Sequence, residues 1–315
     1  MSRLLPLLVS ETGLSEYDIM KIVRNAPKRY KTYPIGKRNG GERIISQPAR
    51  ELKALQRILV DKVLSGLPVH PAATAYRKGT SIRVNAAVHA GNGPILKFDF
   101  KDFFPSIVAR DWRVYCEKKA LFADAVDVWI STNIFFRKAG SHPSLRLAIG
   151  APSSPSLSNI LMNEFDAKIV ELVSQDRVKY TRYADDMTFS AARTGFLTIV
   201  EKALRKTIKE IKSPALTINS EKTVLATRKY KRFVTGLVLT NDGEVSIGQD
   251  RKRKIRAALH NERYGRLEPL QRTELAGLLA FVYDVEPEFF ARLEQKYGQG
   301  LIRRLRAERD ERLPP

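Results

Sequence analysis

Apolar residues recur at two different spacings along the chain, and these spacings separate helical from strand-like segments. Residues 49–67 place Leu52, Leu55, Leu59 and Val63 on one face, which predicts a helix. The same patterns predict helices over 14–24, 82–90 and 201–212 and repeatedly after 249, and a helix-rich stretch from the end of KDFFPSI (101–107) to about residue 138. They predict strands or hairpins over 30–48, 94–100, 179–191 and 232–248, and either a strand pair or a strand and turn over 216–226.

Local turn and cap signals refine this outline. The hairpin at 30–48 turns at Asn39-Gly40-Gly41, and the hairpin at 232–248 closes near Asp242-Gly243. Ser154-Pro155 predicts the start of a helix that continues to Val173, with Ser154 as N-cap and Pro155 in the first turn. Helices and antiparallel hairpins are mixed along the chain, which predicts an α+β fold.

The net charge of +21 narrows the class of partner. The excess is +10 over residues 1–100, +2 over 101–200 and +9 over 201–315. Basic ends around a nearly neutral centre suit a protein that binds a polyanion at its flanks and keeps acidic chemistry in the middle. Since no cationic amphipathic helix dominates, nucleic acid is favoured over a membrane surface.

Cysteine, histidine and hydropathy exclude several other classes. The single cysteine, Cys116, cannot form an internal disulfide and fits a reducing cytoplasm. The four histidines lack metal-ligand spacing, which argues against a zinc site. No apolar run is long enough for a bilayer span, and the apolar start has no cleavage site typical of a signal peptide. We therefore expect a cytoplasmic protein with no membrane partner.

Two adjacent carboxylates, Asp185 and Asp186, occupy the turn of the predicted 179–191 hairpin. Asp99 lies near the end of the predicted strand at 94–100, and pairing of that strand with the hairpin would bring the three acids together. Confined carboxylates repel one another unless cations lie among them. Mg²⁺ prefers carboxylate and phosphate oxygens, and two ions ~4 Å apart can drive displacement at a phosphate. An exposed acidic turn is the alternative.

Three motifs in order resemble the palm of a reverse transcriptase: "FDFKDFF", "GAPSSP" before a helix, and "YADD" in a hairpin. Two further elements resemble hallmarks of the retron reverse transcriptases. These are "NAAVH", residues 85–89, and "VTG", residues 234–236. The resemblance spans roughly residues 28–248. It implies a right-hand polymerase with an N-terminal helix and fingers over 1–93, a palm over 94–248 with a helical fingers segment at about 120–148, and a helical thumb over 249–315.

The resemblance assigns catalytic roles to the three acids. Asp99 and Asp185 correspond to metal ligands, Asp186 to the second acid of the turn, and the carbonyl of Phe100 to a further ligand. Two Mg²⁺ ions are the implied cofactors.

The same resemblance implies a nucleotide site. Phe104 corresponds to a steric gate against ribonucleotides, although an ordinary core aromatic is the alternative, and Phe103 is the better core candidate. Arg43 corresponds to the triphosphate-binding arginine of the fingers, and Lys222 to a lysine near the leaving phosphates. Gly150 and Ala151 correspond to the loop that contacts nucleotide and template. Ile149 departs from the glutamine of many relatives, so a hydrogen bond to substrate is not carried over there.

RNA and primer contacts are the last implied set. Asn85 and His89 lie on one helix face and are expected to recognise RNA, or else to cap the helix and fill a polar niche. Val234, Thr235 and Gly236 correspond to the primer grip. The basic run Arg251, Lys252, Arg253 and Lys254 is expected to meet RNA phosphates, with a solvated helix face as the alternative.

The implied function is RNA-directed DNA synthesis in a retron. The enzyme would copy part of its cognate structured noncoding RNA, prime from the 2′-hydroxyl of a guanosine, and leave branched single-stranded DNA. Its partners would be that RNA and DNA, deoxynucleoside triphosphates, and an effector protein of an antiphage defence system. The alternatives are another small bacterial reverse transcriptase, an RNA-dependent RNA polymerase, which Phe104 disfavours, and a nucleoprotein scaffold that restrains a toxic effector.

Overall fold

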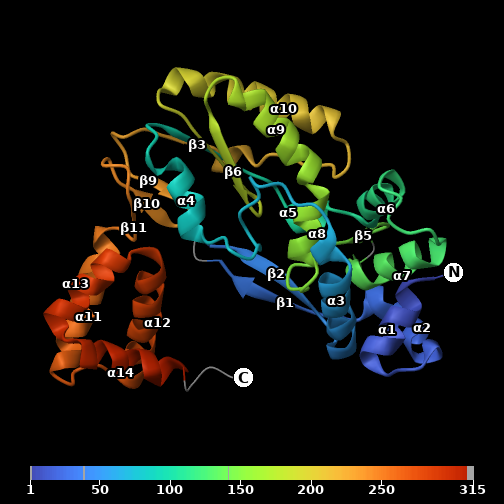
Figure 1. The fold of residues 1–315 in the computed structure, drawn as a ribbon, viewed down its shortest axis with the longest axis horizontal. Helices are drawn as coiled ribbons and strands as arrows, with labels where there is room; N and C mark the ends of the chain where they lie inside the picture. Colours follow the sequence, from blue (N-terminus) through green and yellow to red (C-terminus); the bar gives the residue numbers. More distant parts are fainter. Residues whose placement is uncertain (1, 38–39, 141, 311–315) are drawn as a thin grey trace. The chain divides into compact units, whose positions relative to one another are not determined.

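The computed structural model describes residues 2–37, 40–140 and 142–310, and it divides into two compact units. Unit 1 comprises residues 1–78, 96–189 and 195–224, and unit 2 comprises residues 79–95, 190–194 and 225–315. Helices and antiparallel sheets alternate through the chain (Figure 1), which confirms the α+β class. The division into fingers, palm and thumb at the sequence boundaries stays a prediction.

Unit 1 begins with helices and a long hairpin. Its elements up to the central sheet are α1 (Leu4–Thr12), α2 (Glu16–Asn25), η1 (Ala26–Lys28), β1 (Tyr30–Gly36), β2 (Glu42–Pro48), α3 (Arg50–Lys62) and η2 (Leu64–Gly66). Strands β1 and β2 pair antiparallel in continuous register from Tyr30 opposite Pro48 to Gly36 opposite Glu42. This is the predicted 30–48 hairpin; Asn39 of its turn lies outside the described residues.

A four-stranded sheet with the order β6-β7-β3-β8 is the scaffold of the site. Its strands are β3 (Ile95–Asp99), β6 (Lys179–Tyr183), β7 (Asp186–Ser190) and β8 (Val224–Ala226). Strands β6 and β7 form the predicted hairpin, and β7 lies beside β3, as expected from the sequence. Buried Phe98 and Phe189 meet edge to face with ring centroids 5.9 Å apart, so aromatic packing fixes these strands against each other.

Helices and short strands complete unit 1. They are α5 (Phe103–Ser106), α6 (Ala109–Lys118), α7 (Ala125–Phe135), β4 (Arg137–Lys138), β5 (Leu145–Arg146), α8 (Ser154–Leu161), α9 (Asn163–Ser174), η3 (Thr194–Leu197), α10 (Thr198–Glu210) and η4 (Ser220–Lys222). Helices α9 and α10 pack side by side (Figure 1), and α9 also packs on β6.

Unit 2 combines one helix, a small sheet and a helical bundle. Its elements are α4 (Ile82–Ala90), β9 (Arg232–Val234), β10 (Leu237–Leu239), β11 (Val245–Ser246), α11 (Gln249–Arg263), α12 (Pro269–Val285), α13 (Pro287–Tyr297) and α14 (Gln299–Asp310). Helix α4 packs on β9 and β10 (Figure 1). One apolar core runs through the unit, from Ala86 of α4 through Leu237 of β10 to Leu279 of α12.

Several predicted boundaries need correction. The helix predicted from Ser154 begins there, so Ser153 is the N-cap, and its side chain makes no cap hydrogen bond. That helix also breaks at Met162, which separates α8 from α9. The 232–248 segment forms three strands instead of one hairpin, because a tight turn at Thr235 and Gly236 already reverses the chain.

Helix α1 is missing from the sequence prediction for a physical reason. Its start is capped by a residue more than a hundred positions away. The Asp127 carboxylate accepts hydrogen bonds from the backbone N–H groups of Arg3 and Leu4 at 2.8 and 3.0 Å. These bonds satisfy amides that have no partner within the helix, and buried Leu4 and Leu8 anchor it. Such a tertiary cap leaves no local signal in the sequence.

Candidate active site

The three acids named from the sequence lie at one end of the central sheet in unit 1. Asp99 is the last residue of β3, and Asp185 and Asp186 form the end of the two-residue turn and the first residue of β7. The backbone N–H of Phe100 donates to the carbonyl of Asp185 at 3.2 Å, which fixes the strand end against the turn. Asp99 is buried, and Asp185 and Asp186 are half-buried.

The turn itself has an unusual backbone. Ala184 adopts a left-handed conformation with φ 57°, which costs free energy for a residue with a Cβ. Ala184 is 5% exposed, so the chain around it holds the turn in this shape. Backbone strain that surrounding contacts maintain is characteristic of functional positions.

Lysines compensate part of the negative charge. Nζ of Lys222, on η4, lies 2.9 Å from Oδ1 of Asp99. The pKa of Lys222 is raised by its hydrogen bond with Asp99, which keeps the ammonium charged. The charge of Lys97 on β3 acts on Asp186 and favours its ionised form.

Ionisation of the two turn carboxyl groups remains unfavourable despite these lysines. Burial, followed by the charge of Asp99, raises the pKa of Asp185 to about 6. Burial also raises the pKa of Asp186, and the charge of Asp99 adds to the effect. A group of acids whose ionisation is costly in the absence of cations is a suitable donor set for a hard divalent ion.

A metal cluster in the strict sense is absent from the part of the chain that the structure describes: no group of three or more His, Cys, Asp or Glu side chains is arranged around one point. At Asp99, the ammonium of Lys222 lies against the carboxylate oxygen Oδ1. The carboxylates still fit Mg²⁺ in chemistry and in charge, because a cation favours their ionised form, and Lys222 lies where a cation is favoured.

Three aromatic rings lie next to this acidic end. Half-buried Phe104 lies 6.5 Å from Tyr76, and Tyr76 lies 6.4 Å from Tyr183, measured between ring centroids. Burial raises the pKa of Tyr76, and the charge of Asp185 raises it further while Arg43 lowers it. Phe103 is buried and stacks on Phe100 at 5.7 Å, so Phe103 is a core ring, and the role of Phe104 at the sugar stays a prediction.

The loop at Gly150 and Ala151 packs against strand β2. The N–H of Ser46 donates to the carbonyl of Ile149 at 2.7 Å. A Cβ on Gly150, which has φ 110°, would lie 2.9 Å from Cγ2 of Ile45. Glycine is thus required for the approach of this loop to β2, a constraint apart from any contact with substrate. Ala151 is buried, and Arg43 on the same strand is exposed.

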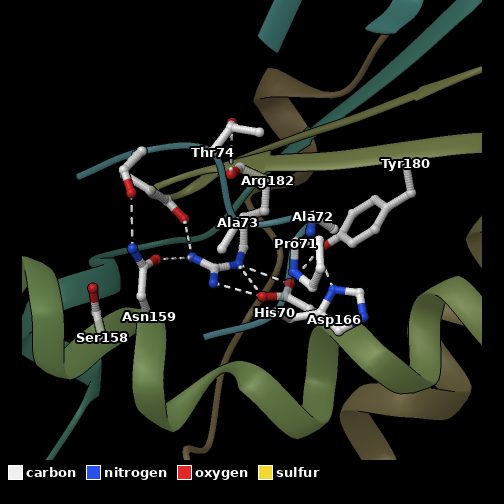
Figure 2. A network of polar contacts seen from close by, with 12 residues as sticks. His70, Pro71, Ala72, Ala73, Thr74, Ser158, Asn159, Asp166, Tyr180 and Arg182 are labelled. Atoms are coloured by element: carbon white, nitrogen blue, oxygen red, sulfur yellow. Dashed lines mark hydrogen bonds and ion pairs between the residues drawn. The ribbon is translucent and has the colours of Figure 1, made fainter. Parts of the chain in front are cut away.

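A buried polar network around Arg182 (Figure 2) is hydrogen-bonded to the backbone of the acidic turn. The Arg182 guanidinium is fully buried and binds the Asp166 carboxylate, with Nη2 2.7 Å from Oδ2. Nη1 of Arg182 donates to the carbonyl of Ala184 at 3.0 Å, directly before Asp185. Asn159 accepts from Arg182 and donates to the carbonyl of Ala75, next to Tyr76. The Arg182 guanidinium thus connects the acidic turn, through Asn159, with the segment that carries Tyr76.

The residues predicted to bind RNA lie in unit 2, and several need correction. Asn85 and His89 are on one face of α4 as predicted, but their side chains are 1% and 0% exposed. His89 Nδ1 lies 2.7 Å from Oγ of Ser190, and Asn85 reaches towards Oγ1 of Thr235. Direct contact of these two side chains with RNA is therefore corrected in favour of the polar-niche alternative.

The VTG segment forms the tight turn between β9 and β10. Val234 is buried, and Thr235 and Gly236 both have positive φ, 47° and 79°. Oγ1 of Thr235 donates to the carbonyl of Ile82 at 3.2 Å, which ties the turn to the start of α4. The two hallmark motifs contact each other through Asn85 and Thr235.

The basic run at the start of α11 is only partly available to a ligand. Lys252 is 8% exposed and pairs with Glu286, which corrects its predicted role in RNA binding to one in packing. Nη1 of Arg251 donates to the carbonyl of Gly236 at 2.9 Å. Arg253 pairs with Asp250, and Lys254 is exposed.

Tyr76, Arg182 and Asp166 are site residues that the sequence analysis missed. Arg182 lies three positions before Asp185, and an arginine inside the predicted 179–191 hairpin was an available signal of a buried ion pair. Tyr76 and Asp166 reach the site only through tertiary packing, so neither could be found from sequence spacing.

Comparison with known proteins shows the family of the chain. Residues 35–252 match the family model described as reverse transcriptase (RNA-dependent DNA polymerase). The chain is 34% identical to the retron Ec83 reverse transcriptase of Escherichia coli, over 92% of this chain and 94% of that protein. It is 33% identical to the retron Ec86 reverse transcriptase of Escherichia coli, with 91% and 88% covered.

Solved structures show more distant similarity. A telomerase from Candida albicans has a TM-score of 0.45 at 14% identity, covering 90% of this chain and 61% of that one. A foamy viral protease–reverse transcriptase has a TM-score of 0.44 at 13% identity, covering 88% and 43%. The chain thus spans about half the length of these structures.

No helix among the described residues has the length and hydropathy of a membrane span. The family match covers more than half of the chain, and it coincides with the segment that contains Asp99, Asp185 and Asp186. This chain belongs to the reverse transcriptase family, as a retron reverse transcriptase with RNA-directed DNA polymerase activity.

Proposed function

We propose that this enzyme copies part of its own retron RNA into DNA at the acidic end of the central sheet in unit 1. The observation that carries the proposal is the convergence of Asp99, Asp185 and Asp186 with Lys222 on one strand end. In this proposal the three carboxylates hold two Mg²⁺ ions, with the carbonyl of Phe100 as a further ligand. Bound Mg²⁺ supplies activation of the attacking hydroxyl and stabilisation of the leaving pyrophosphate.

The chain's own residues then bind and orient the nucleotide. Arg43 binds the triphosphate through its guanidinium, which is suited to a bidentate phosphate contact. Phe104 lies under the sugar and excludes a 2′-hydroxyl by contact. Lys222 neutralises the leaving phosphates and donates a proton to them, since its raised pKa keeps it protonated. Gly150 and Ala151 border the base pair that forms.

A direct assay tests the catalytic assignment. Purified enzyme should extend a DNA or RNA primer on an RNA template with deoxynucleoside triphosphates and Mg²⁺, and the Asp185→Asn variant should not. Asp102→Asn is a matched control, because Asp102 is an exposed acid three positions after Asp99 and has no assigned role. Equal activity of Asp185→Asn and the control would contradict the assignment.

The retron role adds a specific product. We propose priming from the 2′-hydroxyl of a guanosine in the cognate noncoding RNA, which leaves a branch between RNA and single-stranded DNA. The sequence identity to retron enzymes supports this step. Co-expression of the gene with its neighbouring DNA should yield a DNA that a debranching enzyme releases from RNA. Recovery of only linear DNA would favour another type of small reverse transcriptase.

The last part of the proposal is a biological role in defence against phage. The nucleoprotein would act with an effector protein in defence against phage. Cells carrying the locus should resist phage, and Asp185→Asn with Asp186→Asn should remove that resistance together with the DNA. Retained resistance without DNA would support the scaffold alternative, in which binding of the effector matters and synthesis does not.

A further inference from the structure

Unit 2 contains a positively charged groove that none of the roles above uses. It has a volume of about 470 Å³ and is lined by Gly91, Gly93, Pro94, Ala192, Arg193, Thr194 and Arg228. Two of these residues are exposed arginines in loops: Arg193 lies in the loop after β7, and Arg228 lies in the loop after β8.

These arginines are not neutralised within the part of the chain that the structure describes. Neither Arg193 nor Arg228 forms an ion pair or a side-chain hydrogen bond there. A third guanidinium, that of buried Arg232, lies close enough for Arg228 to act on it: burial lowers the pKa of Arg232, and the charge of Arg228 lowers it further. Guanidinium groups that converge without a carboxylate form a site for an anion.

The floor of the groove is rigidly built. Arg232 donates to the backbone carbonyls of Asn92 and Gly93, the latter at 2.7 Å. The N–H of Gly93 donates to the carbonyl of Ala191 at 3.0 Å. A Cβ on Gly93 would lie 2.7 Å from the carbonyl oxygen of Ala192, so the two walls meet in contact that only glycine permits.

Helix α4, which carries the NAAVH motif, supports the groove through a buried hydrogen-bonded contact with Ser190. His89 Nδ1 lies 2.7 Å from Oγ of Ser190, and Nδ2 of Asn92 donates to the same oxygen at 2.8 Å. Ser190 begins the segment that carries Arg193. His89 is fully buried and touches no ligand itself; it is a positioning residue for the arginine segment.

Exposed aromatic residues continue the charged surface. Thr227 to Tyr230 form a turn, closed by a hydrogen bond of 2.9 Å from the N–H of Tyr230 to the carbonyl of Thr227. Arg228 and Tyr230 therefore belong to one turn, and Tyr230 is 64% exposed. Phe233, three residues on, is 45% exposed. Guanidinium groups beside exposed aromatic rings are the combination that binds unpaired nucleotides, through phosphate and base together.

We propose that the Arg193–Arg228 groove binds the phosphodiester backbone of an unpaired nucleic-acid strand, with a base stacked on Tyr230. Under the proposed function two sources carry this chemistry, a single-stranded stretch of the retron RNA and the single-stranded DNA product. Which strand binds, RNA or DNA, rests on the proposed function. The groove itself does not, because all its lining residues belong to unit 2. Paired RNA fits poorly, because its bases are not available for stacking.

The binding test uses labelled oligonucleotides of about 12 residues, one of unstructured RNA, one of the same sequence in DNA, and one of duplex RNA. Fluorescence anisotropy is measured between about 50 and 200 mM salt. Arg193→Gln with Arg228→Gln should weaken single-strand binding by about 10-fold and lower the slope of log affinity against log salt by about 1.4. Tyr230→Ala should weaken binding by about 5-fold, with little change of the salt slope.

Matched controls separate this site from general charge. Arg24→Gln with Arg57→Gln removes the same charge from two exposed arginines of unit 1, and it should change affinity by less than about 2-fold. If the control variant lost as much affinity as the groove variant, the proposal would be overturned. Unchanged affinity of the groove variant would overturn it too. Tighter binding of duplex RNA would assign the surface to a paired region and overturn it as well.

The two single-stranded probes identify the source. The probe whose affinity falls more in the groove variant is the strand that the groove binds, RNA or DNA. A cross-link from 4-thiouridine RNA or 4-thiothymidine DNA should map to the peptide containing Tyr230. Primer extension by the unmodified enzyme is measured in parallel: its failure would contradict the proposed function, while the binding data would still decide the groove.

Discussion

The ammonium of Lys222 lies 2.9 Å from a carboxylate oxygen of Asp99, although the two residues are 123 positions apart in the chain. Lys222 is on a single 3₁₀ turn, and its side chain is 60% exposed, so only its charged end is held. The lysine thus provides positive charge at the acidic end of the sheet. Under the proposed function, its exposed side chain moves towards the leaving phosphates when a nucleotide binds.

Replacement of Lys222 should affect chemistry more than nucleotide binding. We expect Lys222→Gln to lower the single-turnover rate of nucleotide addition by about 100-fold, the usual contribution of a general acid. Lys101→Gln, which removes an exposed lysine after β3, is the control and should retain the rate. A loss confined to KM would show that Lys222 only binds phosphate, and an unchanged rate would remove it from the site.

Asp185→Asn should stabilise the metal-free protein while it abolishes synthesis. Since the pKa of Asp185 is raised to about 6, its carboxylate is ionised at pH 7.5 at a cost to the folded state. Removing that charge should increase the free energy of unfolding by about 1–3 kcal/mol in EDTA. Mg²⁺ should raise Tm in the wild type and much less in the variant. A variant that is less stable in EDTA would contradict this account of the acidic end.

Phe104 should control sugar selectivity. Phe104→Ala removes the ring that faces the proposed sugar position, so the ratio of kcat/KM for deoxynucleotides to that for ribonucleotides should fall by at least about 10-fold. Phe103→Leu is the control: it alters a buried ring that stacks on Phe100, and it should affect stability without changing the ratio. An unchanged ratio in Phe104→Ala would make Phe104 an ordinary packing residue.

The sequence was informative where local patterns determine structure. The β1–β2 and β6–β7 hairpins, helix α4 and the helices after residue 249 all have strong periodicity or turn chemistry. The juxtaposition of Asp99 with the acidic turn could be inferred because β3 and the hairpin were natural partners in one sheet. These are features that a chain encodes within short windows.

Tertiary contacts account for what could not be predicted. Lys252 reads as a surface base within a basic run, but half-buried Glu286, between α12 and α13, gives it an ion-pair partner. His89 reads as a candidate RNA contact, but Ser190 gives it a buried hydrogen-bond partner. In both cases the deciding group is distant in sequence, and no spacing rule includes it.

Acid should destabilise the protein partly through His70, which lies beside the Arg182 network (Figure 2). Burial lowers the pKa of His70; Asp166 opposes this effect, and Arg182 and Arg77 add to it. Nδ1 accepts from the N–H of Ala72 at 3.2 Å, which requires a neutral ring nitrogen. A folded-state pKa below the unfolded value gives stability that is present above about pH 6.5 and lost as the pH falls.

His70→Asn keeps a hydrogen-bond acceptor that does not titrate in this range. The free energy of unfolding, measured by urea denaturation, should therefore decline less between pH 7 and pH 5 in His70→Asn than in the wild type. His142→Asn, at an exposed histidine, should follow the wild-type profile. Parallel profiles for His70→Asn and the wild type would show that His70 does not contribute.

The Arg182–Asp166 pair allows stability to be separated from positioning of the turn. Arg182→Met leaves a buried carboxylate unpaired, which should cost about 3–5 kcal/mol. The double variant Arg182→Met with Asp166→Leu removes both charges, so it should recover much of this loss in free energy of unfolding. It cannot restore the hydrogen bond from Arg182 to the carbonyl of Ala184. We therefore expect the double variant to be folded yet to have a kcat at least about 10-fold below that of the wild type.

The single variant Asp166→Asn provides the comparison for that experiment. It weakens the ion pair but keeps the donor from Arg182 to Ala184, so its activity should exceed that of the double variant at equal stability. The apparent Mg²⁺ affinity gives a second measure, because a displaced turn moves Asp185 relative to Asp99 and weakens their joint hold on a cation. If the double variant is as active as the wild type and binds Mg²⁺ equally well, the network serves folding alone, and the strained backbone at Ala184 must be held by the packing of β6 and β7.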